Sequence, residues 1–220
     1  ATMTYTKSGK VRPGCLVCGE KVFRFGNYPW IVDPAGKPWK TTCPSCKTVY
    51  PTNDFGKYYE SAIDEHGLFD PAKGDRSLLF NAEHPDPADP LHKWGVDDGY
   101  GYIDADGNSH RFIAYFGWKY WQYVCGGVGV LAEAYVMTGD PLYAHKCAVL
   151  LDRIADVYPA MDWSKYAKMG WYHSDGGSKR GKIEGRIWET GVLTDFARNY
   201  DKIITGLADQ PELYQFLAEM

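Results

Sequence analysis

Apolar side chains recur at helical spacing between Pro141 and Tyr158. Asp140 stands where an N-cap is expected, and Pro141 takes the first helical position, where a missing N–H does no harm. The apolar stripe, at positions i, i+4, i+7, i+8, i+11, i+14 and i+15, consists of Tyr143, Cys147, Leu150, Leu151, Ile154, Val157 and Tyr158. This period predicts an amphipathic helix with one face in a core.

The preceding run, from Phe112 to Met137, is apolar around nearly its whole circumference, and Gly139 ends it. A helix without a polar face is expected to be buried on most sides. The run also carries Gly126, Gly127 and Gly129, although glycine has a low helix propensity. We expect these glycines to let a neighbouring element approach closely.

Two further helices are predicted, from Ile183 to about Ile204 and from Pro211 to Met220. The core positions of the first are Trp188, Val192, Phe196, Tyr200 and Ile203. Short connections between successive helices favour antiparallel hairpins. One buried helix beside amphipathic ones indicates a layered or double-ring arrangement, so the predicted fold class is mainly α.

The chain before this helical portion, which spans residues 111–220, has a different character. Residues 1–56 are rich in Gly, Pro and Cys, with short β-like segments such as residues 21–25. Residues 57–110 are a loop-rich connection, in which Pro85, Pro87 and Pro90 exclude a long helix. Residues 212–220 read as an amphipathic helix without a Gly or Pro stop signal, so we expect the helical portion to be truncated at its C-terminus.

Composition indicates a globular chain, since 45% of its 220 residues are hydrophobic and 24% are charged. The net charge of −4 argues against a general nucleic-acid binder, which is usually basic. No apolar run reaches the roughly 18 residues that cross a bilayer, so no membrane partner is expected. Aromatic side chains cluster at Tyr115, Trp118, Tyr120, Trp121 and Tyr123. We expect most of these rings in a core, with one or two facing a cleft as the alternative.

Four cysteines form the pattern C-x2-C, twenty-four residues, C-x2-C, at Cys15, Cys18, Cys43 and Cys46. Each C-x2-C turn supplies two thiolates at the separation that tetrahedral zinc requires. The pattern predicts one structural zinc ion. Two disulfides in an exported protein are the alternative. The nearby Lys and Arg residues are scattered, which favours a structural brace over a nucleic-acid-binding ribbon.

The other two cysteines, Cys125 and Cys147, fall on adjacent predicted helices. Free cysteines are commonly small core residues, and both are interpreted in that way. A disulfide between them is the alternative in an oxidising compartment.

A glycine-rich basic loop precedes the helix that starts near Ile183. Its cations and aromatic flank suit a carboxylate or sulfate, because a helix N-terminus favours anions and a guanidinium can grip them with two hydrogen bonds. The alternative is a solvated surface loop. The candidate binding residues are His173, Lys179, Arg180, Arg186, Trp188 and Glu189.

A second candidate lies at Asp97 and Asp98, between aromatic residues. The pair could act as an acid and base or line a sugar-binding loop. Adjacent carboxylates usually diverge, whereas glycosidase pairs need a defined separation across the bond. A turn capped by aspartate is therefore the favoured interpretation.

Several segments together resemble a known family. They are Trp94-Gly-Val-Asp-Asp-Gly-Tyr-Gly-Tyr, Phe112-Ile-Ala-Tyr-Phe-Gly-Trp-Lys-Tyr-Trp, Ala134-Tyr-Val-Met-Thr-Gly-Asp-Pro-Leu-Tyr, and Gly185-Arg-Ile-Trp-Glu-Thr-Gly with Asp195-Phe-Ala-Arg-Asn-Tyr-Asp. Over about residues 43–220 the chain resembles the heparinase II/III-like polysaccharide lyases. The Thr-Gly-Asp-Pro-x-Tyr junction is also similar to that of other helical toroids, including unsaturated-glucuronyl hydrolases.

The resemblance implies a partial (α/α) toroid, normally followed by a β-rich half of the same polypeptide, in a periplasmic or secreted protein. It implies β-elimination on acidic, uronic-acid-containing polysaccharide. The family's neutralising Asn and catalytic His fall beyond Met220 by this resemblance, and its catalytic Tyr lies further on. It therefore assigns no catalytic residue here, and this chain alone is expected to be inactive. The family's cleft along the inner-helix ends makes His173, Arg186, Trp188 and Glu189 binding candidates.

Two other functions stay open on the sequence. A helical-toroid glycoside hydrolase would need a well-separated carboxylate pair. A non-catalytic carbohydrate-binding or structural fragment would need no such pair.

Overall fold

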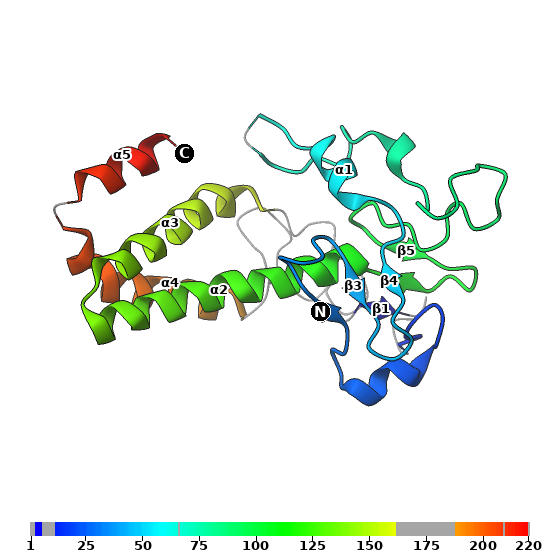
Figure 1. The fold of residues 1–220 in the computed structure, drawn as a ribbon, viewed down its shortest axis with the longest axis horizontal. Coiled ribbons are helices and arrows are strands. Elements are labelled where there is room, and N and C mark those ends of the chain that lie inside the picture. Colours follow the sequence, from blue (N-terminus) through cyan, green and yellow to red (C-terminus); the bar gives the residue numbers. More distant parts are fainter. Residues whose placement is uncertain (1–2, 6–11, 66, 162–187, 209, 220) are drawn as a thin grey trace. The chain divides into compact units, whose positions relative to one another are not determined.

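The structure is a computed structural model that describes residues 3–5, 12–65, 67–161, 188–208 and 210–219 (Figure 1). The chain divides into two compact units, a first unit of Ala1–Tyr120 and a second unit of Trp121–Met220. The long helix α2 (Phe112–Thr138) contributes residues to both. Helices predominate and the strands are short, which confirms the prediction of a mainly α chain.

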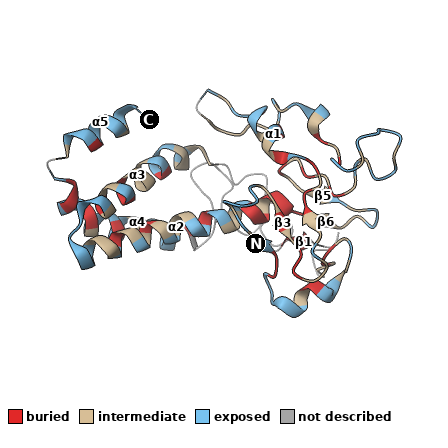
Figure 2. Ribbon diagram, viewed as in Figure 1, coloured by how far each residue is buried: buried red, intermediate tan, exposed pale blue. Residues whose placement is uncertain are grey.

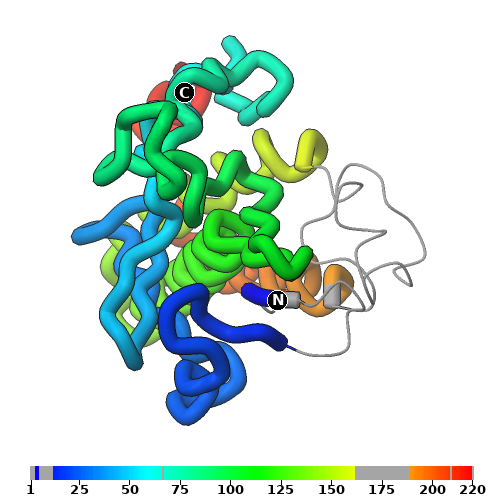
Figure 3. The backbone as a smooth tube through the Cα atoms, turned by 90° about the vertical axis from the view of Figure 1, so that its right-hand side faces the viewer, coloured from blue at the N-terminus to red at the C-terminus, as the bar shows by residue number. Residues whose placement is uncertain are grey.

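The first unit contains two small antiparallel sheets (Figure 1). Figure 3 follows the course of the backbone from a second side. One sheet has the order β1-β6-β5, formed by Thr4–Tyr5, Ser109–His110 and Tyr102–Ile103. The other has the order β2-β3-β4, formed by Ile31–Val32, Thr41–Thr42 and Val49–Tyr50. Short helical turns complete the unit, namely η1 (Glu20–Phe25), α1 (Phe55–Glu60) and η2 (Arg76–Leu78).

The β-like segment predicted at residues 21–25 is wrong, because this stretch is the 3-10 helix η1. Its first turn continues directly from the first cysteine turn. The N–H of Lys21 donates to the Cys18 carbonyl at 3.3 Å, and that of Val22 donates to the Gly19 carbonyl at 3.5 Å. Bonds three residues apart keep the backbone in 3-10 geometry, so the tight turn decides the local structure.

Aromatic rings fill the core of the first unit. Tyr50 is fully buried and stacks on Phe112, with ring centroids 4.5 Å apart and planes 6° apart. Trp30 meets Tyr50 edge-on at 6.1 Å. Offset and edge-to-face pairs of this kind add to the burial of the rings themselves. Of the predicted aromatic cluster, Tyr115 is buried, whereas Tyr120 is 51% exposed.

The second unit is helical (Figure 1). Besides the C-terminal part of α2 it contains α3 (Pro141–Val157), η3 (Tyr158–Ala160), α4 (Trp188–Ile203), η5 (Ile204–Leu207) and α5 (Pro211–Glu219). The predicted start of α3 is confirmed, since the Asp140 carboxylate accepts from the N–H of Leu142 at 2.9 Å. The core includes Val128, Ala132, Cys147 and Ile203.

The prediction that the 112–137 helix is buried on most sides is wrong for its C-terminal part (Figure 2). Within the described structure, Tyr123 is 60% exposed, Val130 69% and Met137 83%. Only the stripe through Val128 and Ala132 lies in the core of the second unit. An apolar circumference shows that a helix tolerates burial on every side, but the packed neighbours decide which side is covered.

The helix glycines do not make the predicted close approach. A Cβ at Gly126 would meet nothing within 4 Å, and one at Gly127 or Gly129 would make ordinary contacts at 3.6 Å and 3.9 Å. The close approach occurs instead at Gly206 in η5, where a Cβ would lie 2.6 Å from the Tyr135 ring and 2.8 Å from the Ala144 Cβ. The absence of a side chain at Gly206 therefore allows Tyr135 and Ala144 to approach η5 closely.

Substituting Gly206 is expected to destabilise the second unit. Gly206→Ala forces the Tyr135 ring or the Ala144 backbone to shift, and overpacking of this kind typically costs about 1–3 kcal/mol. Gly126→Ala is the control, because it adds a methyl group in open space and gains up to about 1 kcal/mol of helix propensity. Urea unfolding followed by far-UV circular dichroism measures both. Equal midpoints for the two variants would contradict the packing described.

No helix among the described residues is both long enough and apolar enough to cross a membrane.

Candidate metal centre

Each pair of cysteines sits on a tight, hydrogen-bonded turn. In the first, the Cys15 N–H donates to the Gly19 carbonyl at 3.1 Å, and the Gly19 N–H donates back to the Cys15 carbonyl at 2.9 Å. Gly14 has φ of +83°, and a Cβ there would lie 2.3 Å from the Gly19 carbonyl oxygen, so only glycine fits. In the second, the Cys43 N–H donates to the Thr48 carbonyl at 2.9 Å.

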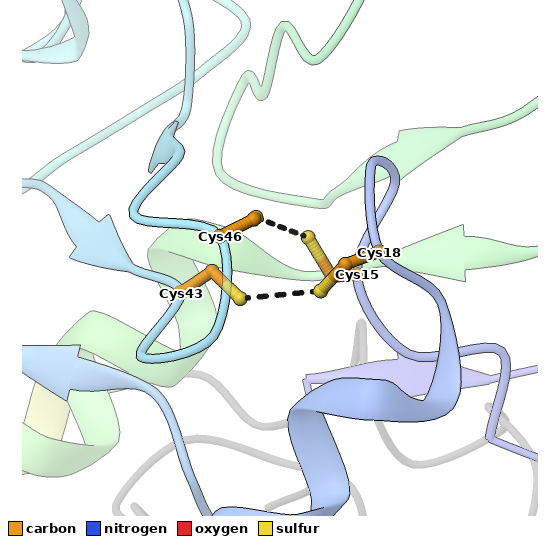
Figure 4. A group of neighbouring side chains, drawn as sticks. All are labelled: Cys15, Cys18, Cys43 and Cys46. Carbon is orange, nitrogen blue, oxygen red and sulfur yellow. Dashed lines mark hydrogen bonds between the residues drawn. The ribbon is translucent and has the colours of Figure 1, made fainter.

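The two turns bring all four cysteine sulfurs together (Figure 4). The ligand atoms lie within 4.8 Å of one another. Cys15 Sγ is 3.6 Å from Cys46 Sγ, and Cys18 Sγ is 3.7 Å from Cys43 Sγ. A tetrahedron with metal–sulfur bonds of about 2.3 Å has sulfur–sulfur edges of about 3.8 Å. The cluster therefore has the dimensions of a site for a single metal ion.

Burial differs between the four ligands. Cys15 and Cys43 are buried in the aromatic core of the first unit, whereas Cys18 and Cys46 are partly exposed. Burial raises the pKa of Cys15, and it raises the pKa of Cys43 to about 12. Burial also acts to raise the pKa of Cys46, but hydrogen bonds from Thr48 and the neighbouring cysteines outweigh it and lower that pKa to about 7. A positive ion would compensate the cost of holding thiolates here.

Hydrogen-bonding groups surround the sulfurs. The Tyr50 hydroxyl oxygen lies 3.3 Å from Cys15 Sγ, and the Thr48 hydroxyl oxygen lies 3.1 Å from Cys46 Sγ. The N–H of Val17 points at Cys15 Sγ from 3.5 Å. These partners were not predicted from the sequence. Of the two hydroxyl contacts, only that of Thr48 could have been predicted from the sequence, because Thr48 lies two residues after Cys46.

Asp97 is a buried structural residue, which confirms its interpretation as a turn-capping aspartate. One carboxylate oxygen accepts from the N–H groups of Gly99 at 2.7 Å and Gly101 at 2.9 Å. The other accepts from those of Phe112 at 2.9 Å and Ile113 at 3.1 Å, which are the first residues of α2. One side chain thus satisfies two donors of a glycine-rich turn and two free donors of a helix N-terminus.

Two features of the environment of Asp97 act on its pKa in opposite directions. Burial raises the pKa of Asp97 to about 6, while the N–H groups that it accepts from favour the ionised form. Asp98 has a different partner set, accepting from the Tyr100 N–H at 3.1 Å and pairing with Arg76 at 3.6 Å. The two carboxylates are therefore engaged separately, each with its own set of partners.

The remaining candidates are placed only in part. His173, Lys179, Arg180 and Arg186 lie outside the described residues, and Trp188 is the first residue of α4. Glu189, in the first turn of α4, is buried, with 8% exposed.

The two helix cysteines belong to the second unit. Cys147 is buried and its thiol donates to the Val128 carbonyl at 3.5 Å, which confirms its interpretation as a small core residue. Cys125 packs partly buried against the same core. No disulfide joins the two in the described structure.

Comparison with known proteins gave no match to a family model, a curated protein or a solved structure. The functional argument therefore rests on the residues of this chain.

Proposed function

We propose that Cys15, Cys18, Cys43 and Cys46 hold one structural zinc ion. The observation that carries this is the mutual approach of the four sulfurs, at 3.6 Å and 3.7 Å across the two turns. Four thiolates in a tetrahedron suit zinc, and four protein ligands leave no position open for a substrate. The ion would join residues 15–18 to residues 43–46 and brace the core between them.

We further propose that the chain is the helical region of a polysaccharide lyase that cleaves uronic-acid-containing polysaccharide by β-elimination. The support is the resemblance noted above. Two of the segments that carry it contain a residue with a defined structural role. Asp97 accepts from the N–H of Phe112 at the start of α2, and Asp140 caps the start of α3. In such a reaction a base removes the C5 proton, an acid protonates the leaving oxygen, and donors neutralise the adjacent carboxylate.

A partial (α/α) toroid is the arrangement that we propose for the helices. Apolar side chains are exposed on four of them, such as Val130 on α2, Leu142 on α3, Tyr200 on α4 and Phe216 on α5. Positions of this kind lie against neighbouring helices in a toroid, so their exposure supports the proposal. A glycoside hydrolase is less well supported, because Asp97 is buried and engaged with backbone donors.

Acidic polysaccharide is expected to bind weakly to this 220-residue chain. Heparan, chondroitin-type and alginate chains are the probes, with affinity measured by calorimetry at low and high salt. Salt should weaken binding, because exposed charges are screened over about 10 Å at 0.1 M ionic strength. Absorbance of unsaturated uronate should stay flat, because the resemblance places no catalytic residue here.

Variants locate the binding residues. Arg186→Ala and Trp188→Ala are expected to reduce the affinity several-fold, whereas Arg153→Ala, which removes an exposed cation paired with Asp156, should leave it unchanged. Robust unsaturated product from this chain would mean that it contains catalytic groups. No binding to any of the three polyanions at low salt would overturn the proposal that the glycine-rich basic loop binds acidic polysaccharide.

A further inference from the structure

Two hydroxyl groups of the first unit point at metal-site sulfurs, and both come from the chain that follows the second cysteine turn. The Tyr50 hydroxyl lies 3.3 Å from Cys15 Sγ, and the Thr48 hydroxyl lies 3.1 Å from Cys46 Sγ. Each of the two turns therefore has one sulfur with a hydroxyl beside it. The partners lie 35 and 2 residues apart in the chain, so the first contact exists only in the folded unit.

Tyr50 is held rigidly in this position. Its backbone pairs with Thr41 in the β2-β3-β4 sheet, and its ring is stacked on Phe112 and met edge-on by Trp30. The residue is fully buried. Its ring cannot turn the hydroxyl away from Cys15 without disturbing this packing.

The chemistry of a bound thiolate settles the direction of these hydrogen bonds. A metal-bound cysteine sulfur has no proton and can only accept, so each hydroxyl must donate. Donation withdraws charge from the sulfur, which lessens its nucleophilicity and offsets part of the repulsion among four thiolates on one ion. Partners of this kind orient metal ligands and tune the metal.

We propose that Tyr50 and Thr48 are positioning residues of the metal centre, whose hydroxyls donate to the thiolates of Cys15 and Cys46. This inference rests on the proposed zinc site. The Tyr50 hydroxyl donates to the buried ligand, Cys15, and the Thr48 hydroxyl donates to the partly exposed ligand, Cys46. Loss of the Tyr50 hydroxyl should have the larger effect, because water can take the place of Thr48 but does not reach a fully buried position.

Tyr50→Phe tests the first contact, since it keeps the ring and removes only the hydroxyl. Zinc affinity, measured by competition with a chromophoric chelator, is expected to fall about 10-fold, the lower end of the range for such partners. Bound cobalt(II) should show its sulfur-to-metal charge-transfer band at lower energy, because an unprotected thiolate gives up an electron more readily. Cys15 should also be alkylated faster by iodoacetamide.

Tyr58→Phe is the matched control. Tyr58 is equally buried, and its hydroxyl donates to the Pro71 carbonyl at 3.3 Å instead of to a sulfur. This variant should keep the zinc affinity and the cobalt band of the unaltered chain. A general loss of stability would affect both variants alike, whereas a role at the metal affects only Tyr50→Phe.

Thr48 supplies a second variant, at a side chain that also interacts with that of Tyr50. Thr48→Val should shift the cobalt band in the same direction by a smaller amount, and Thr48→Ser, which restores a hydroxyl, should return it. Unchanged affinity and spectra in both Tyr50→Phe and Thr48→Val, with metal bound, would overturn the inference and leave the zinc site standing. Failure of the unaltered chain to bind zinc(II) or cobalt(II) would overturn both.

Discussion

Removing the proposed zinc ion with a chelator is expected to abolish most of the stability of the first unit. Structural zinc in zinc-finger peptides contributes roughly 10–16 kcal/mol of binding free energy at pH 7. A whole small domain is stable by only about 5–15 kcal/mol. Cys15 and Cys43 are members of the core that also contains Val22, Trp30 and Tyr50, so removing the ion that joins the two cysteine turns would loosen that core.

Hydrogen exchange with EDTA and without it measures this loss. The amides of Gly19, Cys43 and Lys47, which form the backbone bonds of the two turns, should lose their protection. Amides of α3, whose core lies in the second unit, are the internal control and should keep theirs.

Cys43→Ser should reproduce the effect of the chelator and leave the purified protein without stoichiometric metal. Cys147→Ala is the matched variant, because it removes a buried cysteine from the second unit and should retain about one zinc per chain. Intact mass showing the four site cysteines oxidised, with no metal present, would contradict the zinc assignment.

Asp97→Asn is expected to destabilise the first unit by about 2–5 kcal/mol, since each buried donor left unsatisfied costs about 1–3 kcal/mol. The carboxylate accepts four backbone N–H groups, two at each oxygen. An amide has one oxygen, so two of the donors would face its NH2 group. The change therefore loosens either the glycine turn or the N-terminus of α2.

Urea unfolding monitored by tryptophan fluorescence gives the size of this effect, and exchange of the Phe112 and Ile113 amides locates it. Asp98→Asn is the neighbouring control. It keeps an acceptor for the Tyr100 N–H and loses only a partly exposed pair with Arg76, a change worth less than about 1 kcal/mol. Equal stability of the two variants would show that Asp97 does not anchor the helix.

Local spacing was enough to predict the features that depend on near neighbours. Helix α3 begins at Pro141 behind the Asp140 cap, because the cap and the apolar period both depend on residues that are close together in the chain. The two C-x2-C turns likewise predicted a cluster of four sulfurs, since each turn positions its own two cysteines. Asp97 could be assigned to a turn for the same reason.

Features that join distant residues appeared only in the folded chain. Asp97 reaches the N-terminus of α2 fifteen residues later, Tyr50 reaches Cys15 across thirty-five, and Gly206 makes room for Tyr135. Which side of α2 is exposed also could not be predicted from the sequence, because this helix is apolar on every face. Residue type and spacing specify what a side chain can do, whereas packing between elements specifies which partner it meets and which face water reaches.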